Sequence, residues 1–440
     1  MNRTSCLKQF VKYASLNVIG MLGISFYILA DTFFIARGLG ANGLAALNLA
    51  IPVYSFIHGC GLMLGMGGAT RYSIYISQGK SKNADITFTN TIFLTCIFAL
   101  CFFAAGLFLS SPITALLGAD EVIFDMTDIY LKVILLFSPA FILNEVLLGF
   151  ARNNGNPGLS MLAMIGGSLV NIVFDYILIF PCGLGIFGAV LATGFSPLCS
   201  LLILSTLKIQ KKNQFHFTRT NLSFHISRAV MSLGFPSLVT EISSGIVMIV
   251  FNFIILDLSG NVGVAAYGVV ANLAIVSISI FTGIAQGMQP LISRACGSRN
   301  LRQARQFLCY GIYTVILISA VIYLGIFFFT APVAAAFNKE RNTVLQQIAE
   351  TGLRLYFTGI VFAGLNIILS VYFTSIEKPL PAHIISILRG FLFIIPLAFL
   401  LSALWGITGV WLAFPAAESL VTILGFIMYR YLYSFFIENP

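Results

Sequence analysis

The stretch Ser168-Leu-Val-Asn171-Ile-Val-Phe-Asp175-Tyr-Ile-Leu-Ile-Phe180 carries an amide and a carboxylate inside a long apolar run. Asn171 and Asp175 are four residues apart, about one helical turn, so they share one face of a helix. The run is long enough to cross a bilayer, where an Asp costs roughly 2.5–3.5 kcal/mol on insertion scales. Because a cost of this size is normally tolerated for a function, we interpret Asp175 as part of an ion-binding site that drives transport.

The composition of the whole chain also indicates a membrane protein. The chain is 58% hydrophobic and 9% charged, with a mean hydropathy of +0.96, whereas soluble domains are about 25% charged. This composition predicts an all-α polytopic membrane protein in contact with membrane lipids. The net charge of +9 comes from basic residues that punctuate loops and form no basic face or tail, so no nucleic-acid partner is expected.

Twelve segments are long and apolar enough to span a membrane. Their approximate limits are 13–36, 44–77, 86–110, 122–148, 157–180, 186–207, 232–257, 264–294, 305–330, 343–375, 381–403 and 405–430. Eighteen Lys and Arg residues fall on the side of the N-terminus, and only Arg37, Lys339 and Arg341 fall on the opposite side. The positive-inside rule therefore predicts that both termini face the cytoplasm.

An internal repeat divides these segments into two sets of six. Gly185-Ile-Phe-Gly-Ala-Val-Leu-Ala192 recurs as Gly406-Ile-Thr-Gly-Val-Trp-Leu-Ala413, and Gly61-Leu-Met-Leu-Gly-Met66 recurs as Gly283-Ile-Ala-Gln-Gly-Met288. Six spans give both halves the same topology, related by a pseudo-twofold axis along the membrane normal. We predict an N-terminal six-helix lobe (1–210), a cytoplasmic connecting loop (211–228) and a C-terminal six-helix lobe (229–440), with a central cavity between the lobes.

The intramembrane acids of the first half break this repeat. Asp31 and Asp175 align near apolar residues of the second half. The direction of each span places Asp31, Asn171, Asp175 and Thr193 at similar depth. Two carboxylates, an amide and a hydroxyl form an oxygen-rich pocket suited to Na⁺, or a pair of acids that can share a proton. The alternative is a pair of acids hydrogen-bonded for packing or fold specificity.

The second half has a polar set of its own. Glu241, Arg389 and Glu418 each lie about eight to twelve residues from the cytoplasmic ends of their spans, and Asn366 repeats Asn144 of the first half. Arg389 could neutralise one carboxylate and leave the other to face a cationic substrate. The alternative is an internal charge network that holds the second lobe together.

Patterns typical of enzymes are incomplete. Neither a phosphate loop nor a nucleophile–base pair is present, and the cysteines and histidines show no metal-ligand spacing. We expect Glu145 to be solvated or paired with Arg152, and the histidines suggest no role. We therefore expect no enzymatic activity and no cofactor besides a coupling ion.

Several motifs resemble the multidrug and toxic compound extrusion (MATE) transporters, especially the bacterial DinF-like and MepA-like branch. They are Tyr27-Ile-Leu-Ala-Asp31-Thr-Phe-Phe-Ile35, Gly43-Leu-Ala-Ala46, Gly65-Met-Gly-Gly68-Ala69, Asn171-x-x-x-Asp175, residues 188–193 and Gly234-Phe-Pro236. The resemblance covers nearly the whole chain. It implies a twelve-helix, two-lobed exporter in the bacterial inner membrane, with Asp31, Asn171, Asp175 and Thr193 as the cation site. Asp31, Asn171 and Asp175 would bind the metal if Na⁺ is the coupling ion.

The sequence thus predicts a monomeric antiporter that exports small amphipathic organic cations in exchange for H⁺ or Na⁺ by alternating access. One alternative is a flippase of lipid-linked oligosaccharides from the same superfamily, which would favour basic residues in the cavity. Of the few basic residues within spans, only Arg389 is deep. A membrane-embedded enzyme and a non-transporting sensor are further alternatives.

Overall fold

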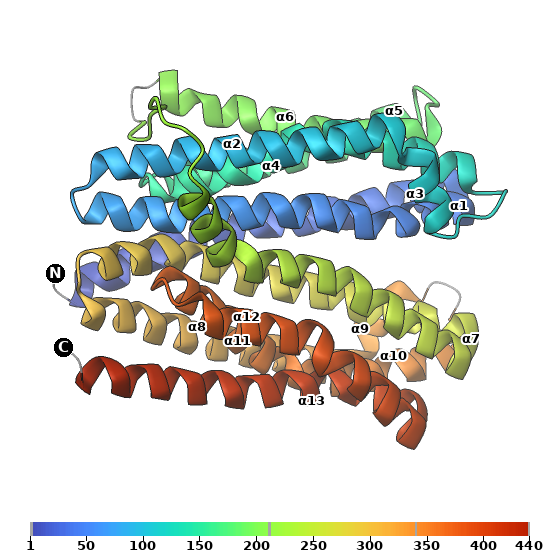
Figure 1. Cartoon of the computed structure of the whole chain (residues 1–440). Coiled ribbons are helices and arrows are strands. Elements are labelled where there is room, and N and C mark those ends of the chain that lie inside the picture. The colour runs from blue at the N-terminus through green and yellow to red at the C-terminus, as the bar shows by residue number, and fades with distance from the viewer. Residues whose placement is uncertain (1–2, 210–212, 339–340, 439–440) are drawn as a thin grey trace.

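The computed structural model describes residues 3–209, 213–338 and 341–438, and these ranges contain helices but no strand. Figure 1 shows the helices running roughly parallel to one another through the molecule. In chain order they are α1 (Arg3–Ser77), α2 (Ser81–Phe108), α3 (Ser110–Leu116), α4 (Phe124–Asn153), α5 (Pro157–Ile179), α6 (Gly185–Ile209), α7 (Phe224–Gly297), α8 (Leu301–Phe328), α9 (Thr330–Phe337), α10 (Thr343–Tyr356), α11 (Ile360–Ser375), α12 (Pro379–Ile387) and α13 (Ile394–Glu438). A 3₁₀ turn (Phe357–Gly359) joins α10 to α11, and a π-helical turn (Leu388–Leu392) joins α12 to α13.

The twelve predicted spans are confirmed once three sharp kinks are taken into account. Within the described residues, nine continuous helical stretches are long and apolar enough to cross a membrane. Three of them, α1, α7 and the stretch that ends in α13, each contain a break at Gly40, Gly260 or Gly406. The glycines there adopt φ values of 66°, 62° and 57°, which residues with a Cβ rarely tolerate. Each of these glycines therefore reverses the chain between two consecutive spans.

Backbone geometry repeats between the halves as the sequence does. Five residues with positive φ in the first half have counterparts 220–223 positions later. The pairs are Gly40 and Gly260, Gly79 and Arg299, Gly118 and Arg341, Gly155 and Glu377, and Gly185 and Gly406. Both halves therefore turn at equivalent points even where the second half lacks glycine, which supports the pseudo-twofold relation between them.

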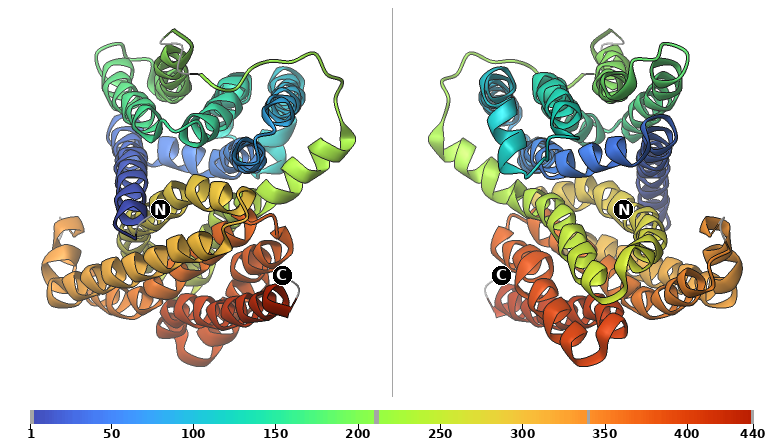
Figure 2. Two further views of the ribbon diagram at one scale, coloured as in Figure 1. Left: turned by 90° about the vertical axis from the view of Figure 1, so that its left-hand side faces the viewer. Right: turned by 90° about the vertical axis from the view of Figure 1, so that its right-hand side faces the viewer.

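The helices form two groups that meet along α1 and α7. We call α1–α6 the first lobe and α7–α13 the second lobe; Figures 1 and 2 show them as the blue-to-green and the yellow-green-to-red groups. Gly234 of α7 lies against the backbone of Met63, where a Cβ would overlap the carbonyl group. At a second contact between α7 and α1, a Cβ on Gly287 would lie 2.7 Å from the Tyr13 carbonyl oxygen. Small residues thus allow the lobes to approach at backbone distance.

Both described ends of the chain lie at the same end of the molecule, which we call the termini end (Figure 1). An even number of spans requires this arrangement. Which side of the membrane the termini end faces stays a prediction from the charge distribution.

The segment between the lobes is pinned to α2 by its backbone. The N–H groups of His216, Thr218 and Ser223 donate to Asp85 Oδ1, Thr89 Oγ1 and Asn90 Oδ1 at 2.9, 3.1 and 2.7 Å. Figure 2 shows this segment crossing the outside of the first lobe before α7 begins at Phe224. The predicted domain boundary at 210/211 lies outside the described residues.

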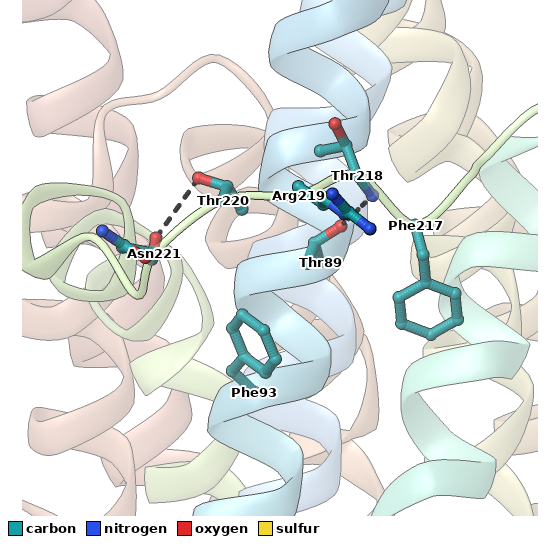
Figure 3. Close-up of a pocket in the computed structure, with 7 residues that line it drawn as sticks. All are labelled: Thr89, Phe93, Phe217, Thr218, Arg219, Thr220 and Asn221. Atoms are coloured by element: carbon teal, nitrogen blue, oxygen red, sulfur yellow. Dashed lines mark hydrogen bonds between the residues drawn. The ribbon is translucent and has the colours of Figure 1, made fainter.

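A surface pocket lies between this segment and α2. It is lined by Thr89, Phe93 and residues 217–221 (Figure 3). None of the buried acids lines it, so this pocket is separate from the predicted ion site.

We predict that Gly234→Ala lowers the thermal stability of the protein, whereas Gly268→Ala does not. A methyl group on Gly234 would overlap the backbone of Met63, and overpacking of this kind typically costs about 1–3 kcal/mol. Gly268 is helical, and a Cβ added to it would meet no atom within 4 Å, so alanine there only removes backbone freedom. Thermal unfolding of both purified variants in detergent measures the difference; equal midpoints would contradict the proposed close crossing of α1 and α7.

Candidate functional site

The four polar residues predicted for the first lobe come together inside it. Asp31 of α1, Asn171 and Asp175 of α5, and Thr193 of α6 are 8%, 0%, 0% and 5% exposed. Asn171 Nδ2 donates to Thr193 Oγ1 at 3.5 Å, and Thr193 Oγ1 donates to its own helix at Ala189. The carboxyl groups of Asp31 and Asp175 lie close enough to interact electrostatically. Three helices therefore converge on one polar site.

The oxygen atoms of this site lack partners. Asp31 Oδ1, Asn171 Oδ1 and both carboxylate oxygens of Asp175 are buried without a hydrogen bond. Among the described residues, no other carboxylate oxygen is buried in this way. Two carboxylates can hydrogen-bond to each other only when one of them holds a proton. The arrangement therefore fits a shared proton or a small cation bound by these oxygens.

Three tyrosines that the sequence did not single out lie beside this site. Tyr130 of α4 lies close enough to Asp31, Asp175 and Thr193 to interact with them electrostatically. The hydroxyl groups of Tyr27 and Tyr54, both on α1, lie 3.1 Å apart. Tyr27 precedes Asp31 by four residues, and this helical spacing was a signal that could have identified it. Tyr130 carries no such signal, because only the packing of α4 brings it to the site.

In the second lobe, Glu418 is fully paired. Arg389 donates to Glu418 Oε1 from Nη2 at 2.7 Å and from Nε at 3.1 Å. Asn366 Nδ2 donates to Glu418 Oε2 at 2.6 Å, and its Oδ1 accepts from Thr422 at 3.1 Å. Arg389 lies in the π-helical turn of residues 388–392, a feature that often marks a specialised position. These contacts favour the alternative of an internal charge network for this part of the cluster.

Glu241 lies outside that network, so Arg389 pairs with one of the two predicted acids and leaves the other to a different partner. Oε2 of Glu241 lies 3.4 Å from Nδ1 of His58, a first-lobe residue. Nε2 of His58 lies 3.6 Å from Oε1 of Glu145, so Glu145 contacts His58 rather than forming the expected ion pair with Arg152. Depth along each span grouped Glu241 with Arg389, but depth does not determine which way a helix face points.

Polar contacts between the lobes gather near the termini end. Arg152 of α4 donates to Gln286 of α7, and at 3.3 Å it also donates to Asn17 within the first lobe. Gln289 of α7 bonds with Asn153 and donates to Thr70 at 2.9 Å. These buried contacts join the loop-proximal ends of α1, α4 and α7, so they hold the lobes together there.

Comparison with known proteins agrees with this architecture. The MatE family model matches residues 18–177 and 236–400. The multidrug export protein MepA of Staphylococcus saprophyticus is 26% identical over 426 residues, covering 96% of this chain and 93% of the relative. An FAD transporter of Shewanella oneidensis is also 26% identical, covering 92% and 90%.

Solved structures extend the similarity to three dimensions. A MATE crystal structure in complex with MaL6 has a TM-score of 0.93 and 25% identity, covering 98% of this chain and 97% of that one. An outward-facing multidrug resistance MATE transporter of the MOP superfamily gives 0.92 at 25% identity, with the same coverage. A MOP superfamily transporter from Pyrococcus furiosus, described as having a binding pocket of reverse polarity that suggests a different function, gives 0.89 at 25%, covering 97% and 96%.

We predict that Arg389→Met destabilises the protein strongly because it leaves Glu418 buried without its charge partner. Breaking a buried pair typically costs about 3–5 kcal/mol, whereas replacing both partners is often nearly neutral. The double variant Arg389→Met/Glu418→Met should therefore recover most of the lost stability. Thermal unfolding in detergent measures both, and a double variant as unstable as the single one would show that the pair is not the source of the loss.

Proposed function

The chain belongs to the MatE family, and from this premise we propose that this multi-pass transporter is a multidrug efflux antiporter. It exports amphipathic, mainly cationic compounds in exchange for inward H⁺ or Na⁺ by alternating access. The relatives named MepA support drug export as the class of activity. The exchange itself rests on the chemistry of the first lobe.

The proposal of ion coupling rests on one observation, which is that oxygens of Asp31, Asn171 and Asp175 are buried without a hydrogen-bond partner. An unpaired charge in a low-dielectric interior is costly, so it neutralises by protonation or binds a cation. The group that neutralises the site must enter and leave if the lobes alternate between two states. A proton shared by the two acids would leave each Asp a hydrogen-bond partner, and Na⁺ would be bound by the carboxylate and amide oxygens.

Alternating access requires the polar contacts at the termini end to break. If the termini face the cytoplasm, as the basic loops suggest, these contacts close the cytoplasmic side in the present conformation. Loading the first-lobe acids from outside would then bias the lobes, because a ligand shifts a two-state equilibrium only through its different affinity for the two states. The ion would be released inside and the cargo outside.

The cargo is the second part of the proposal. The buried carboxyl groups of Asp31 and Asp175 favour organic cations over anions. The FAD transporter among the relatives is the specific reason to keep a different cargo in view, since this fold carries a flavin nucleotide there. A lipid-linked oligosaccharide flippase remains the further alternative, and its cargo is also anionic.

We predict that proteoliposomes containing the protein expel tetraphenylphosphonium when an inward gradient of H⁺ or of Na⁺ is imposed. The gradient that drives efflux identifies the coupling ion. Asp31→Asn and Asp175→Asn should each reduce driven efflux to the level of empty vesicles, because neither amide can give up a proton or carry the negative charge that a cation requires.

Asp125→Asn is the matched control for this experiment. Asp125 is an exposed Asp in the first turn of α4, away from the site, so its variant should transport like the wild type. Intact transport in both site variants would overturn the ion-coupling proposal. If neither gradient drives efflux and the protein binds FAD or a lipid pyrophosphate, the proposal of a cationic cargo is wrong and the cargo is anionic.

A further inference from the structure

His58 lies between two carboxylates that come from different lobes. Its Nε2 is 3.6 Å from Oε1 of Glu145 on α4, and its Nδ1 is 3.4 Å from Oε2 of Glu241 on α7. His58 and Glu145 belong to the first lobe and Glu241 to the second. The contact between His58 and Glu241 therefore crosses the interface at which the lobes must move.

Proton counting decides what this arrangement requires. A neutral imidazole has one N–H donor and one lone-pair acceptor, so it can donate to only one of two carboxylates. Its other nitrogen would then face a carboxylate oxygen, and that contact is repulsive. Both contacts are attractive only when the ring is an imidazolium with two N–H groups, or when one Glu is itself protonated. In either case, the His58 cluster (His58, Glu145 and Glu241) holds one proton more than a neutral imidazole.

The sequence builds this cluster with glycines on the C-terminal side of His58. A Cβ on Gly59 would lie 3.2 Å from the Cβ of Glu241, and a Cβ on Gly61 would lie 3.0 Å from the Cβ of Glu145. The helices that carry the two carboxylates therefore press against α1 directly beside the histidine. Tyr54, one turn earlier, stacks on the imidazole with ring centres 5.9 Å apart and an angle of 15°.

Other polar groups connect this cluster with its surroundings. Asn144 Nδ2 donates to the same Glu145 oxygen at 3.5 Å, and Arg152 acts on Glu145 electrostatically. Tyr54 Oη lies 3.1 Å from Tyr27 Oη, and Tyr27 is one turn from Asp31 on the same helix. The titratable and charged groups around His58 are therefore Glu145 and Arg152 on α4, Glu241 on α7, and Tyr54 and Tyr27 on α1.

We propose, on the basis of the antiport function above, that His58 is a second proton-binding residue of the transport cycle. With the extra proton bound, the imidazolium joins Glu145 to Glu241 and holds the lobes in the present arrangement. When that proton passes to water, the neutral ring keeps one carboxylate, and Glu241 separates from it. The Glu241 side chain is 33% exposed, so the cluster is open enough for the proton to leave.

The test measures the separation of the lobes against pH, without any cargo. Spin labels are placed at Leu107 on α2 and Phe328 on α8, both exposed and near equivalent helix ends, after the eight native cysteines are replaced by serine. Pulsed electron–electron double resonance then gives the populations of label-to-label distances in nanodiscs from about pH 5 to about pH 9, the range in which imidazoles titrate. We expect the label distance of the present structure to dominate at low pH, where the extra proton is bound, and the ratio of the two distance populations to change roughly five- to hundredfold towards high pH, as is typical of coupled sites.

Four variants identify the residue responsible for the pH-dependent change of the distance populations. This change should persist in Asp31→Asn/Asp175→Asn, which removes the titration of the first-lobe acids, and it should disappear in His58→Gln. His58→Lys, with a fixed positive charge, should keep the label distance of the present structure at every pH. His225→Gln, a substitution of an exposed histidine at the start of α7, should behave like the wild type.

Persistence of the change in His58→Gln would overturn the proposal, as would its loss in the double Asp variant. If His58→Gln fails to fold, Glu241→Gln removes the partner instead and should abolish the change equally. These results are independent of the transport assay. Failure to transport tetraphenylphosphonium would remove the proposed cargo while a His58-dependent movement of the lobes would still stand.

Discussion

The absence of water from the hydrocarbon core is the constraint on which the rest of this structure depends. Each backbone N–H and C=O within the membrane must find a partner in the protein, and a helix provides these partners within one segment. The chain therefore leaves helical geometry at few places, and Gly40, Gly260 and Gly406 allow the sharpest of its reversals. Because these reversals recur at equivalent points, two halves with different side chains fold to the same topology.

Lipid also changes what holds the helices together. Apolar side chains gain little by leaving lipid for a protein interior, so close backbone approach and polar contacts determine which helices pair. Gly234 and Gly287 permit such an approach between α1 and α7, and the contacts of Arg152 and Gln289 lie near the same interface. An interface made of small residues and a few hydrogen bonds has modest stability, which suits the separation of the lobes that the proposed alternating access requires.

The way in which helices pair in lipid also explains what the sequence could and could not predict. Hydropathy predicted the spans, and the repeat predicted their symmetry, because both follow from length and order along the chain. The depth of each polar residue was enough to group Asp31, Asn171, Asp175 and Thr193, since their helices happen to be neighbours in one lobe. Depth was not enough for Glu241, whose partner His58 lies on the other lobe, because the rotation of a helix about its axis depends on packing that no single segment contains.

The contrast between the acids of the two lobes is the strongest guide to their roles. Glu418 receives hydrogen bonds from Arg389 and Asn366, so its charge is satisfied in the present state and needs no external ion. Asp31 and Asp175 occupy an equally buried position without such partners. In this nearly symmetric fold, one lobe thus contains a paired carboxylate, and the other contains two carboxylates that bind a proton or a cation in the proposed antiport. His58 lies between these cases, because one proton decides whether its two carboxylates, and with them the two lobes, are joined.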